Sequence, residues 1–500
     1  MNFMNSMNLN KDPHSFKKSL NLFDSTAIVA GSMIGSGIFI VSADIARQVG
    51  SPGWLMMVWI ITGILTTFAA LSYGELAAMF PKAGGQYVYL KEAYNPLIGF
   101  LFGWTMFLVI QTGTIAAVAM AFAKFTGVIL PAISESVVWF KVDFDKIAVL
   151  KFLPVLKFGP VHLVAIGSIV FLTWVNTRGI KTGKHVQNTF TSGKVLLLIL
   201  FIIIGLGFAA NSNAIQLNKQ IFWEPAQVEN GRNIPLGGFT LITAIGMAMV
   251  GSLFSSDAWN NITFTAGEVI HPRKNIPLSL FLGTFIVTIL YLLANLVYIT
   301  VLPLRGDPDG LTVAGRGMQF AMNDRLATAA ISGVFGNYAM IIMAIFIMIS
   351  TFGCNNGLIL SGARVYYAMA QDGIFFRRSG TLNNHGVPSW GLTMQCVWAA
   401  ILCLSGTYGQ LLDYVIFAVL IFYILTIAGI FILRKKNPDA ERPYKAFGYP
   451  YIPSFYIIIA TIITLILLFY KEYSWGGLII VIIGIPVYFL WNKRKPGIHR

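Results

Sequence analysis

The first residues suited to binding a small charged ligand are a run of small residues, Gly31-Ser32-Met33-Ile34-Gly35-Ser36-Gly37, inside a long apolar segment. Glycine has a low helix propensity, so we expect the helix to unwind between Gly35 and Gly37. The second half of the segment then begins with the amides of Ser36, Gly37 and Ile38 at the positive end of a helix dipole. Such a helix start favours a carboxylate.

A second polar run, Phe254-Ser255-Ser256-Asp257-Ala258-Trp259-Asn260-Asn261, interrupts another apolar segment. Asp257 lies near the middle of that segment. A carboxylate inside a membrane is costly and by default marks a functional site. The carbonyls that an unwound helix exposes beside it suit an ammonium group.

Both runs also have simpler interpretations. Gly31 and Gly35, four residues apart, would let another helix approach closely. Asp257 would cap the lower half of its own helix. The residues taken alone leave these alternatives open.

Lys194 is a third candidate, because it lies about six residues into an apolar segment, roughly 9 Å along a helix from its predicted inner end. A buried ammonium there would bind backbone carbonyls of other helices. The alternative is that its long side chain snorkels to the membrane surface.

These residues belong to a chain with the composition of a membrane protein, 56% apolar and 11% charged. A span needs roughly 20 apolar residues, and runs of that length recur along almost the whole chain. We predict about twelve spans, at 22–48, 53–80, 96–130, 159–176, 188–210, 237–268, 277–302, 328–360, 388–407, 409–433, 453–471 and 476–491.

The distribution of charge predicts the orientation. The first twenty residues are polar and lack the apolar core of a cleavable secretory signal. With both termini in the cytoplasm, the basic stretch from Arg434 to Lys445 and the basic tail from Lys493 also face the cytoplasm, as the positive-inside rule requires. The net charge of +15 therefore reflects orientation, and we expect no nucleic-acid partner.

Other chemistries find no support in the sequence. The six histidines and three cysteines lack metal-ligand spacing, and the spans enclose all three cysteines. No phosphate loop, Gly-x-Ser-x-Gly elbow or His-Glu-x-x-His motif is present. We therefore expect no metal, no cofactor and no enzymatic activity. The only Asn-x-Ser/Thr triplet, at Asn261, lies inside a span, which favours a bacterial inner membrane.

The two polar runs lie five spans apart, so the second block of five spans enters the membrane with the opposite orientation. This predicts an inverted repeat, with one half at 22–210 and the other at 237–433. The spans within 453–491 lie outside it, and the tails 1–21 and 492–500 face the cytoplasm.

Several strings in this order resemble the amino acid-polyamine-organocation (APC) superfamily, and within it the L-type amino acid transporters. After the run from Gly31 to Phe39 they are Tyr73-Gly74-Glu75-Leu76, Phe80-Pro81-Lys82-Ala83-Gly84-Gly85-Gln86-Tyr87, Phe190-Thr191-Ser192-Gly193-Lys194, Phe254 to Trp259, Gly267-Glu268, His271 to Pro277, Ser350-Thr351-Phe352-Gly353, Asn356-Gly357 and Glu441-Arg442-Pro443. Each string is weak evidence alone, but the ordered set is specific.

The resemblance implies an all-α membrane protein with a LeuT-like fold of five plus five inverted helices, discontinuous helices 1 and 6, and alternating access. Carried over by position, Ser36, Gly37 and Ile38 hold a substrate carboxylate. The carbonyls of Met33 or Ile34 and of Phe254 and Ser255 receive its ammonium group. Asp257 adds charge, Phe254 closes over the substrate, and Trp259 packs beside the pocket.

The resemblance also gives Lys194 a role in coupling. Its ammonium would occupy the place of a sodium ion in sodium-coupled relatives, between carbonyls near Gly31 and the hydroxyl of Ser350 or Thr351. Transport would then not require sodium, and both exchange and proton-linked uptake stay open.

We expect a transporter of small or medium neutral L-amino acids. Cationic amino acids or polyamines are the alternative substrates, and a sensing receptor or a channel is the alternative class. Animal members join a heavy subunit through a cysteine between spans 3 and 4, but residues 131–158 contain none. No disulfide-linked subunit is therefore expected. The expected partners are the substrate and the lipid bilayer. The sequence is compatible with a monomer and does not determine the oligomeric state.

Overall fold

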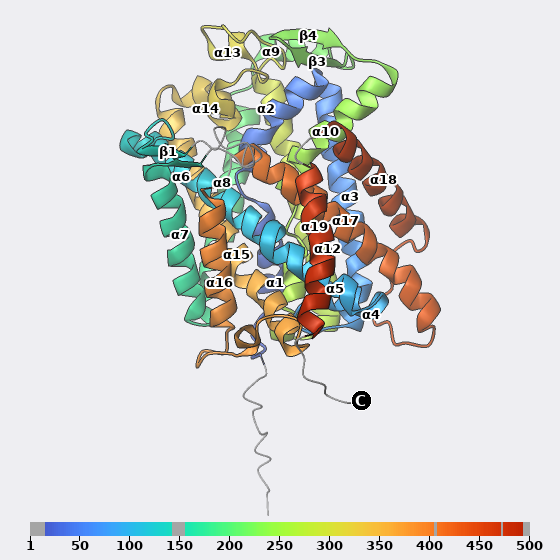
Figure 1. Ribbon diagram of the computed structural model, residues 1–500. Coiled ribbons are helices and arrows are strands. Elements are labelled where there is room, and N and C mark those ends of the chain that lie inside the picture. Colours follow the sequence, from blue (N-terminus) through green and yellow to red (C-terminus); the bar gives the residue numbers. More distant parts are fainter. Residues whose placement is uncertain (1–15, 143–155, 405–407, 472–473, 494–500) are drawn as a thin grey trace, which may run out of the picture.

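The computed structural model describes residues 16–142, 156–404, 408–471 and 474–493. Within these residues the chain is mainly helical (Figure 1). Ten helical segments are long and apolar enough to cross a membrane, and a bent pair supplies one more. The chain is therefore a multi-pass membrane protein.

The spans follow one another in chain order, and two are interrupted. The two interrupted spans are α1 (Leu22–Met33) with α2 (Gly37–Val49), and α10 (Gly238–Ser255) with α11 (Asn261–Phe264). One continuous span contains a π-helical turn and consists of α5 (Pro96–Thr105), η1 (Met106–Ile110) and α6 (Gln111–Ile129). The others are α3 (Pro52–Met79), α7 (Pro160–Thr177), α8 (Ile180–Gly207), α12 (Pro272–Val301), α15 (Tyr338–Gln371), α16 (Ser389–Leu402), α17 (Tyr408–Lys436), α18 (Tyr451–Tyr470) and α19 (Ser474–Lys493).

The connections contain the remaining elements. They are α4 (Gln86–Ala93), α9 (Ser212–Gln220), α13 (Val313–Arg316), α14 (Leu326–Phe335), the 3-10 turns η2 (Pro131–Ile133), η3 (Ala266–Glu268), η4 (Met322–Asp324) and η5 (Arg377–Gly380), and the strands β1 (Phe140–Val142), β2 (Leu156–Phe158), β3 (Ala226–Glu229) and β4 (Arg232–Pro235). The strands pair as two antiparallel hairpins, β1 with β2 and β3 with β4.

Local chemistry sets several helix starts. Asn21 accepts a hydrogen bond from the Asp24 amide, and the Asp24 carboxylate accepts one from the Asn21 amide, which is a capping box. Ser51 and Asn95 cap α3 and α5, each followed by a proline at the first helical position. The predicted starts of spans 1 to 3, at residues 22, 53 and 96, are therefore within one residue of the observed starts.

Several predicted spans have different boundaries in the structure. The segment predicted at 328–360 is two helices, because Gly336 adopts a positive φ of 54° between α14 and α15, and α15 continues to Gln371. The ninth span, predicted at 388–407, is the short helix α16 of 14 residues. Residues 405–407 of that prediction lie outside the described residues, as does most of the two predicted tails.

The interrupted spans pack together near the centre of the molecule. Helix α2 lies along α10, and α3 lies along α12, so spans five apart in sequence are neighbours. Figure 1 shows the start of α1 and the end of α19 at one end of the molecule, opposite the hairpin β3–β4. The inverted repeat at 22–210 and 237–433 stays a prediction.

Candidate functional site

Span 1 is broken where the glycines predict it. Helix α1 ends at Met33, Ile34 adopts an extended conformation with ψ 94°, and α2 begins at Gly37, bent by 41° from α1. The first amides of a helix have no acceptor in a preceding turn. Those of Gly37 and Ile38 are therefore directed at the break, as a carboxylate site requires.

Span 6 is broken after Ser255. Residues 256–260 are not helical, and Ala258 has a positive φ of 64°. That conformation is uncommon for a residue with a side chain and is costly unless packing enforces it. Helix α11 begins only at Asn261 and lasts four residues.

The two breaks lie directly against each other. A methyl group on Gly37 would meet the Ser255 Oγ at 2.0 Å, so only glycine fits at the start of α2. The hydroxyl of Tyr291 in α12 lies 3.1 Å from the Met33 carbonyl oxygen and 3.0 Å from the Ser255 carbonyl oxygen. One tyrosine therefore joins both breaks.

Tyr291 was not among the residues predicted from the sequence. The available signal was a tyrosine in the middle of an otherwise apolar span, because a buried phenol usually needs a hydrogen-bond partner. Nothing in the sequence showed which backbone atoms it would reach.

Lys194 lies deeper than its sequence position suggested. Helix α8 begins at Ile180, eight residues before the predicted start, so Lys194 is roughly 21 Å along the helix. Its side chain is fully buried. The ammonium nitrogen lies 2.5 Å from the Gly31 carbonyl oxygen and 2.7 Å from that of Ile34. The amine therefore binds the break and does not snorkel.

Span 8 binds the same break from the other side. The Ser350 hydroxyl donates to the Gly35 carbonyl at 2.9 Å, while its own carbonyl oxygen is 3.5 Å from the Lys194 nitrogen. Thr351 differs from the prediction, because its hydroxyl donates to the carbonyls of Ile347 and Met348 in its own helix. Ser350 alone of the two contacts Lys194.

The carbonyls predicted to receive an ammonium group already have protein donors. Met33 and Ser255 share Tyr291, Ile34 accepts from Lys194, and Phe254 accepts from the Asp257 amide at 3.2 Å. A carbonyl oxygen has two lone pairs, so each can accept a second hydrogen bond.

Asp257 belongs to the same break but has a different partner. Its carboxylate accepts a hydrogen bond of 2.6 Å from the Tyr423 hydroxyl in α17. Because α11 begins after Asn260 without a side-chain cap, the interpretation of Asp257 as a helix cap does not hold. Trp259 packs its ring against Tyr73 and Tyr423 at centroid distances of 4.8 and 5.2 Å.

A narrow cavity of about 10 Å³, which is room for about one water molecule, adjoins Asp257. Its polar lining comes from the broken span 6, from the connecting helix α4, from span 3 and from α17, namely Asp257, Asn260, Asn261, Gln86, Gln111, Thr114 and Tyr423. Met106 and Ile110 of the π-helical turn η1 complete one wall. Asp257 is among the site residues predicted from the sequence.

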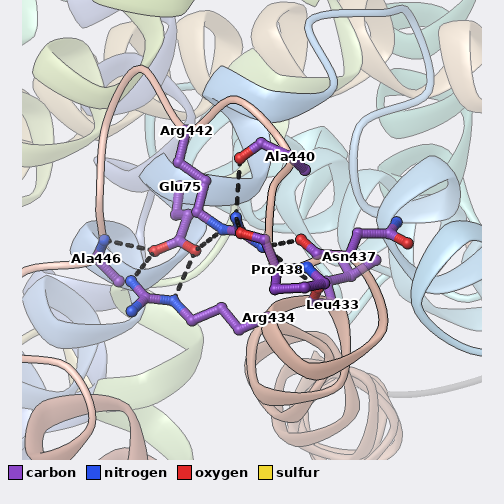
Figure 2. A network of polar contacts seen from close by, with 8 residues as sticks. All are labelled: Glu75, Leu433, Arg434, Asn437, Pro438, Ala440, Arg442 and Ala446. Carbon is purple, nitrogen blue, oxygen red and sulfur yellow. Dashed lines mark hydrogen bonds and ion pairs between the residues drawn. The ribbon is translucent and has the colours of Figure 1, made fainter.

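Three ion pairs join the ends of the same spans on the side where α1 begins. Glu268 and Arg364, both 1% exposed, lie 3.0 Å apart, and Asp24 lies 2.9 Å from Lys184. The Glu75 carboxylate in α3 pairs with the Arg434 guanidinium of α17 at 2.6 Å (Figure 2). Each pair connects span 1, 2 or 6 with span 5, 8 or 10.

Glu75 is the centre of the network in Figure 2. Its carboxylate also accepts from the Ala446 amide at 2.7 Å and lies 3.3 Å from Arg442. The Arg442 guanidinium donates in turn to carbonyls at the end of α17 and in the following loop. Glu75 therefore holds span 2, span 10 and the loop to span 11 together.

Comparison with known proteins identifies the family of the chain. Residues 20–489 match the family described as amino acid permease. The chain belongs to this family. This permease is 28% identical over 500 residues to b(0,+)-type amino acid transporter 1 of Mus musculus, with 97% of the chain and 90% of that protein covered. It is 30% identical over 493 residues to large neutral amino acids transporter small subunit 2 of Homo sapiens, with 96% and 82% covered.

Proposed function

We propose that this permease is a secondary transporter of free L-amino acids that works by alternating access. The observation that carries the proposal is the contact between the two breaks at Gly37 and Ser255. One break presents helix-start amides, which suit a carboxylate, and the other presents carbonyls, which suit an ammonium group. An α-amino acid carries both groups on one carbon.

In this proposal, the amides of Ser36, Gly37 and Ile38 hold the carboxylate. The carbonyls of Met33, Ile34, Phe254 and Ser255 receive the ammonium group through their second lone pairs. Tyr291 keeps the two sets at a constant separation, because it binds Met33 and Ser255 together. The substrate side chain then points toward Asp257 and the adjoining cavity.

Neutral amino acids of small or medium size are the proposed substrates. The cavity beside Asp257 is narrow, and the Tyr423 hydroxyl occupies one oxygen of the carboxylate. One relative is named for large neutral amino acids and another is a b(0,+)-type transporter. The second candidate, a cationic amino acid or a polyamine, is favoured by Asp257 itself, since its carboxylate would pair with a second amine.

Coupling is proposed to rest on Lys194. Its ammonium group bridges the carbonyls of Gly31 and Ile34 in span 1 and approaches Ser350 in span 8, which is what a bound metal cation would do. A fixed cation at this place makes sodium unnecessary. The transport mode is then sodium-independent exchange or proton-linked uptake.

The test uses purified protein in liposomes loaded with one unlabelled amino acid, with labelled amino acid outside. Sodium and a proton gradient are varied independently. Uptake that depends on the internal amino acid and not on sodium supports an exchanger. Uptake driven by a proton gradient alone supports symport.

The same vesicles separate the transporter from a receptor or channel. A channel dissipates a gradient without counterflow, and a receptor binds substrate without uptake. Binding without any substrate-dependent uptake would refute the transporter proposal.

The proposed location is the inner membrane of a bacterium, with both termini cytoplasmic. The human relative is named a small subunit. In this chain all three cysteines lie in or at the end of helical spans, with Cys354 and Cys403 buried and Cys396 partly buried. We therefore propose a permease without a disulfide-linked partner, active as a monomer.

A further inference from the structure

A second hollow, separate from the cavity beside Asp257, opens on the outer surface of the spans. It has a volume of about 420 Å³ and lies between α5, η1, the residues before η5, α16 and α19. Eight of its twelve lining residues are phenylalanine or tryptophan. We refer to it as the aromatic groove.

The floor of the aromatic groove lies well within the length of the spans. Trp104 is eight residues into α5 and Trp398 nine residues into α16, roughly 12 and 13 Å from the helix starts. Tryptophans of an interfacial belt sit at headgroup level. These two instead donate their indole N–H to backbone carbonyls, Trp104 to Ile480 at 3.1 Å and Trp398 to Leu108 at 3.0 Å. They form a fixed apolar surface.

The mouth of the groove lies where α16 begins and α19 ends. Phe376 packs against Trp390 and Trp491 there, at centroid distances of 5.6 and 5.0 Å. The next residues, Arg377 and Arg378, are exposed. The acidic residue of the same connection, Asp372, pairs with Lys91 at 2.8 Å.

We propose that the aromatic groove binds one phospholipid with an anionic headgroup. Its acyl chain lies on Trp104 and Trp398, and its phosphate lies at Arg377 and Arg378. The groove opens to the hydrocarbon of the bilayer, so an acyl chain enters it without crossing water. Basic side chains at a membrane surface attract anionic lipids, at about fivefold in affinity for each charge.

The π-helical turn η1 connects this groove to the candidate substrate site. Phe107 and Leu108 line the groove, while Met106 and Ile110 of the same turn line the cavity beside Asp257. Single π-helical turns inside α-helices are frequent at functional sites. A bound acyl chain therefore packs against the wall of the substrate cavity, and we expect it to tighten substrate binding.

The binding test uses the purified permease in nanodiscs of neutral phosphatidylcholine. Phosphatidylglycerol with bromine atoms at the middle of its acyl chains is titrated in, and tryptophan quenching is measured. We expect a saturable component. It should disappear in the double variant Trp104→Phe/Trp398→Phe and persist when the exposed Trp174 and Trp475 are replaced instead.

The headgroup test compares brominated phosphatidylglycerol with brominated phosphatidylcholine. Arg377→Gln/Arg378→Gln should raise the phosphatidylglycerol concentration for half-quenching by about 5- to 30-fold, at roughly fivefold for each charge. The matched control is Lys181→Gln/Lys274→Gln, which removes two exposed charges elsewhere on the same side of the protein. It should leave the titration unchanged.

Two results would overturn the proposal. One is that both brominated lipids quench tryptophan fluorescence equally and without saturation as their concentration rises, which indicates ordinary boundary lipid. The other is a dimer, detected by native mass spectrometry, whose formation abolishes quenching at Trp104 and Trp398, which would make the groove an interface between copies. Neither readout requires transport, so failure of the proposed function leaves the lipid test intact.

Discussion

At the scale of single residues, the site depends on a few side chains that bind backbone atoms of the breaks. Three side chains from three different spans contact carbonyl oxygens at the two breaks: Lys194, Ser350 and Tyr291. Unwound backbone inside a membrane is stable only where such partners replace the missing helical hydrogen bonds. The same contacts make the geometry of the breaks sensitive to single substitutions.

Lys194→Ala should lower the rate of amino acid exchange at least tenfold. The carbonyls of Gly31 and Ile34 lose their charged donor, which is worth about 1.5–3 kcal/mol for one such hydrogen bond. Measurement of uptake in proteoliposomes, normalised to protein in the membrane, checks this. Lys124→Ala is the control, since that lysine is partly exposed and pairs with Glu135 at 3.6 Å. Unchanged exchange in Lys194→Ala would show that the contact has no role in transport.

Tyr291→Phe should weaken substrate binding about tenfold while the protein keeps its fold. The ring stays in place, but the hydroxyl that joins Met33 to Ser255 is lost. The measurement is substrate affinity by scintillation proximity together with the melting temperature. Tyr338→Phe, which changes a tyrosine that is 74% exposed, is the control. A normal affinity would contradict the role assigned to Tyr291.

At the scale of elements, the helix breaks and the π-helical turn decide what the spans can do. Low helix propensity favours the first break, but the close approach of α2 and α10 determines its position. A side chain at Gly37 would collide with Ser255. The start of α2 is therefore specified by a contact with another span as well as by its own residues.

Gly37→Ala should reduce transport strongly, by at least tenfold, because the new methyl group lies 2.0 Å from the Ser255 Oγ. Ser255→Gly in the same chain should restore part of the activity by removing that atom. Gly167→Ala in α7, where no atom lies within 4 Å, is the control. The transport rates of the wild type, the two single variants and the double variant form a double-mutant cycle, which measures the coupling between Gly37 and Ser255. Additive losses would show that the two residues act independently.

At the scale of the whole molecule, the three ion pairs close one side of the protein around the broken spans. The pair of Glu268 and Arg364 is the most deeply buried, with both side chains 1% exposed. Breaking a buried pair leaves a charge without compensation and costs more than an exposed pair contributes. In the proposed alternating access, spans 1 and 6 would move relative to span 8, and this pair would then have to separate or move with them.

Glu268→Gln should destabilise the permease by about 3–5 kcal/mol, because Arg364 keeps its charge in a buried place. Glu268→Gln combined with Arg364→Met should recover most of that loss. For the exposed pair of Arg273 and Glu441, Glu441→Gln should change stability by about 0–1 kcal/mol. Thermal unfolding in detergent measures all three variants. Equal losses in the single and double variants would contradict the expected compensation.

The sequence by itself determined the membrane class, the order of the spans, and the places where spans 1 and 6 break. Those properties are local, because they follow from apolar length, helix propensity and capping residues within one segment. Gly35 to Gly37 and Asp257 were therefore found without a structure. The family followed from the same ordered strings and agrees with the match over residues 20–489.

Only the tertiary structure decided which groups meet at the breaks. Four features depend on residues far apart in sequence. They are the contacts of Tyr291, the depth of Lys194, the lack of contact between Thr351 and Lys194, and the position of η1 between two cavities. The Lys194 and Gly31 pair, for example, is 163 positions apart. Such contacts arise from how twelve helices pack, and each depends on a rotation or a shift of one helical turn. Periodicity within a single span carries no information about that rotation.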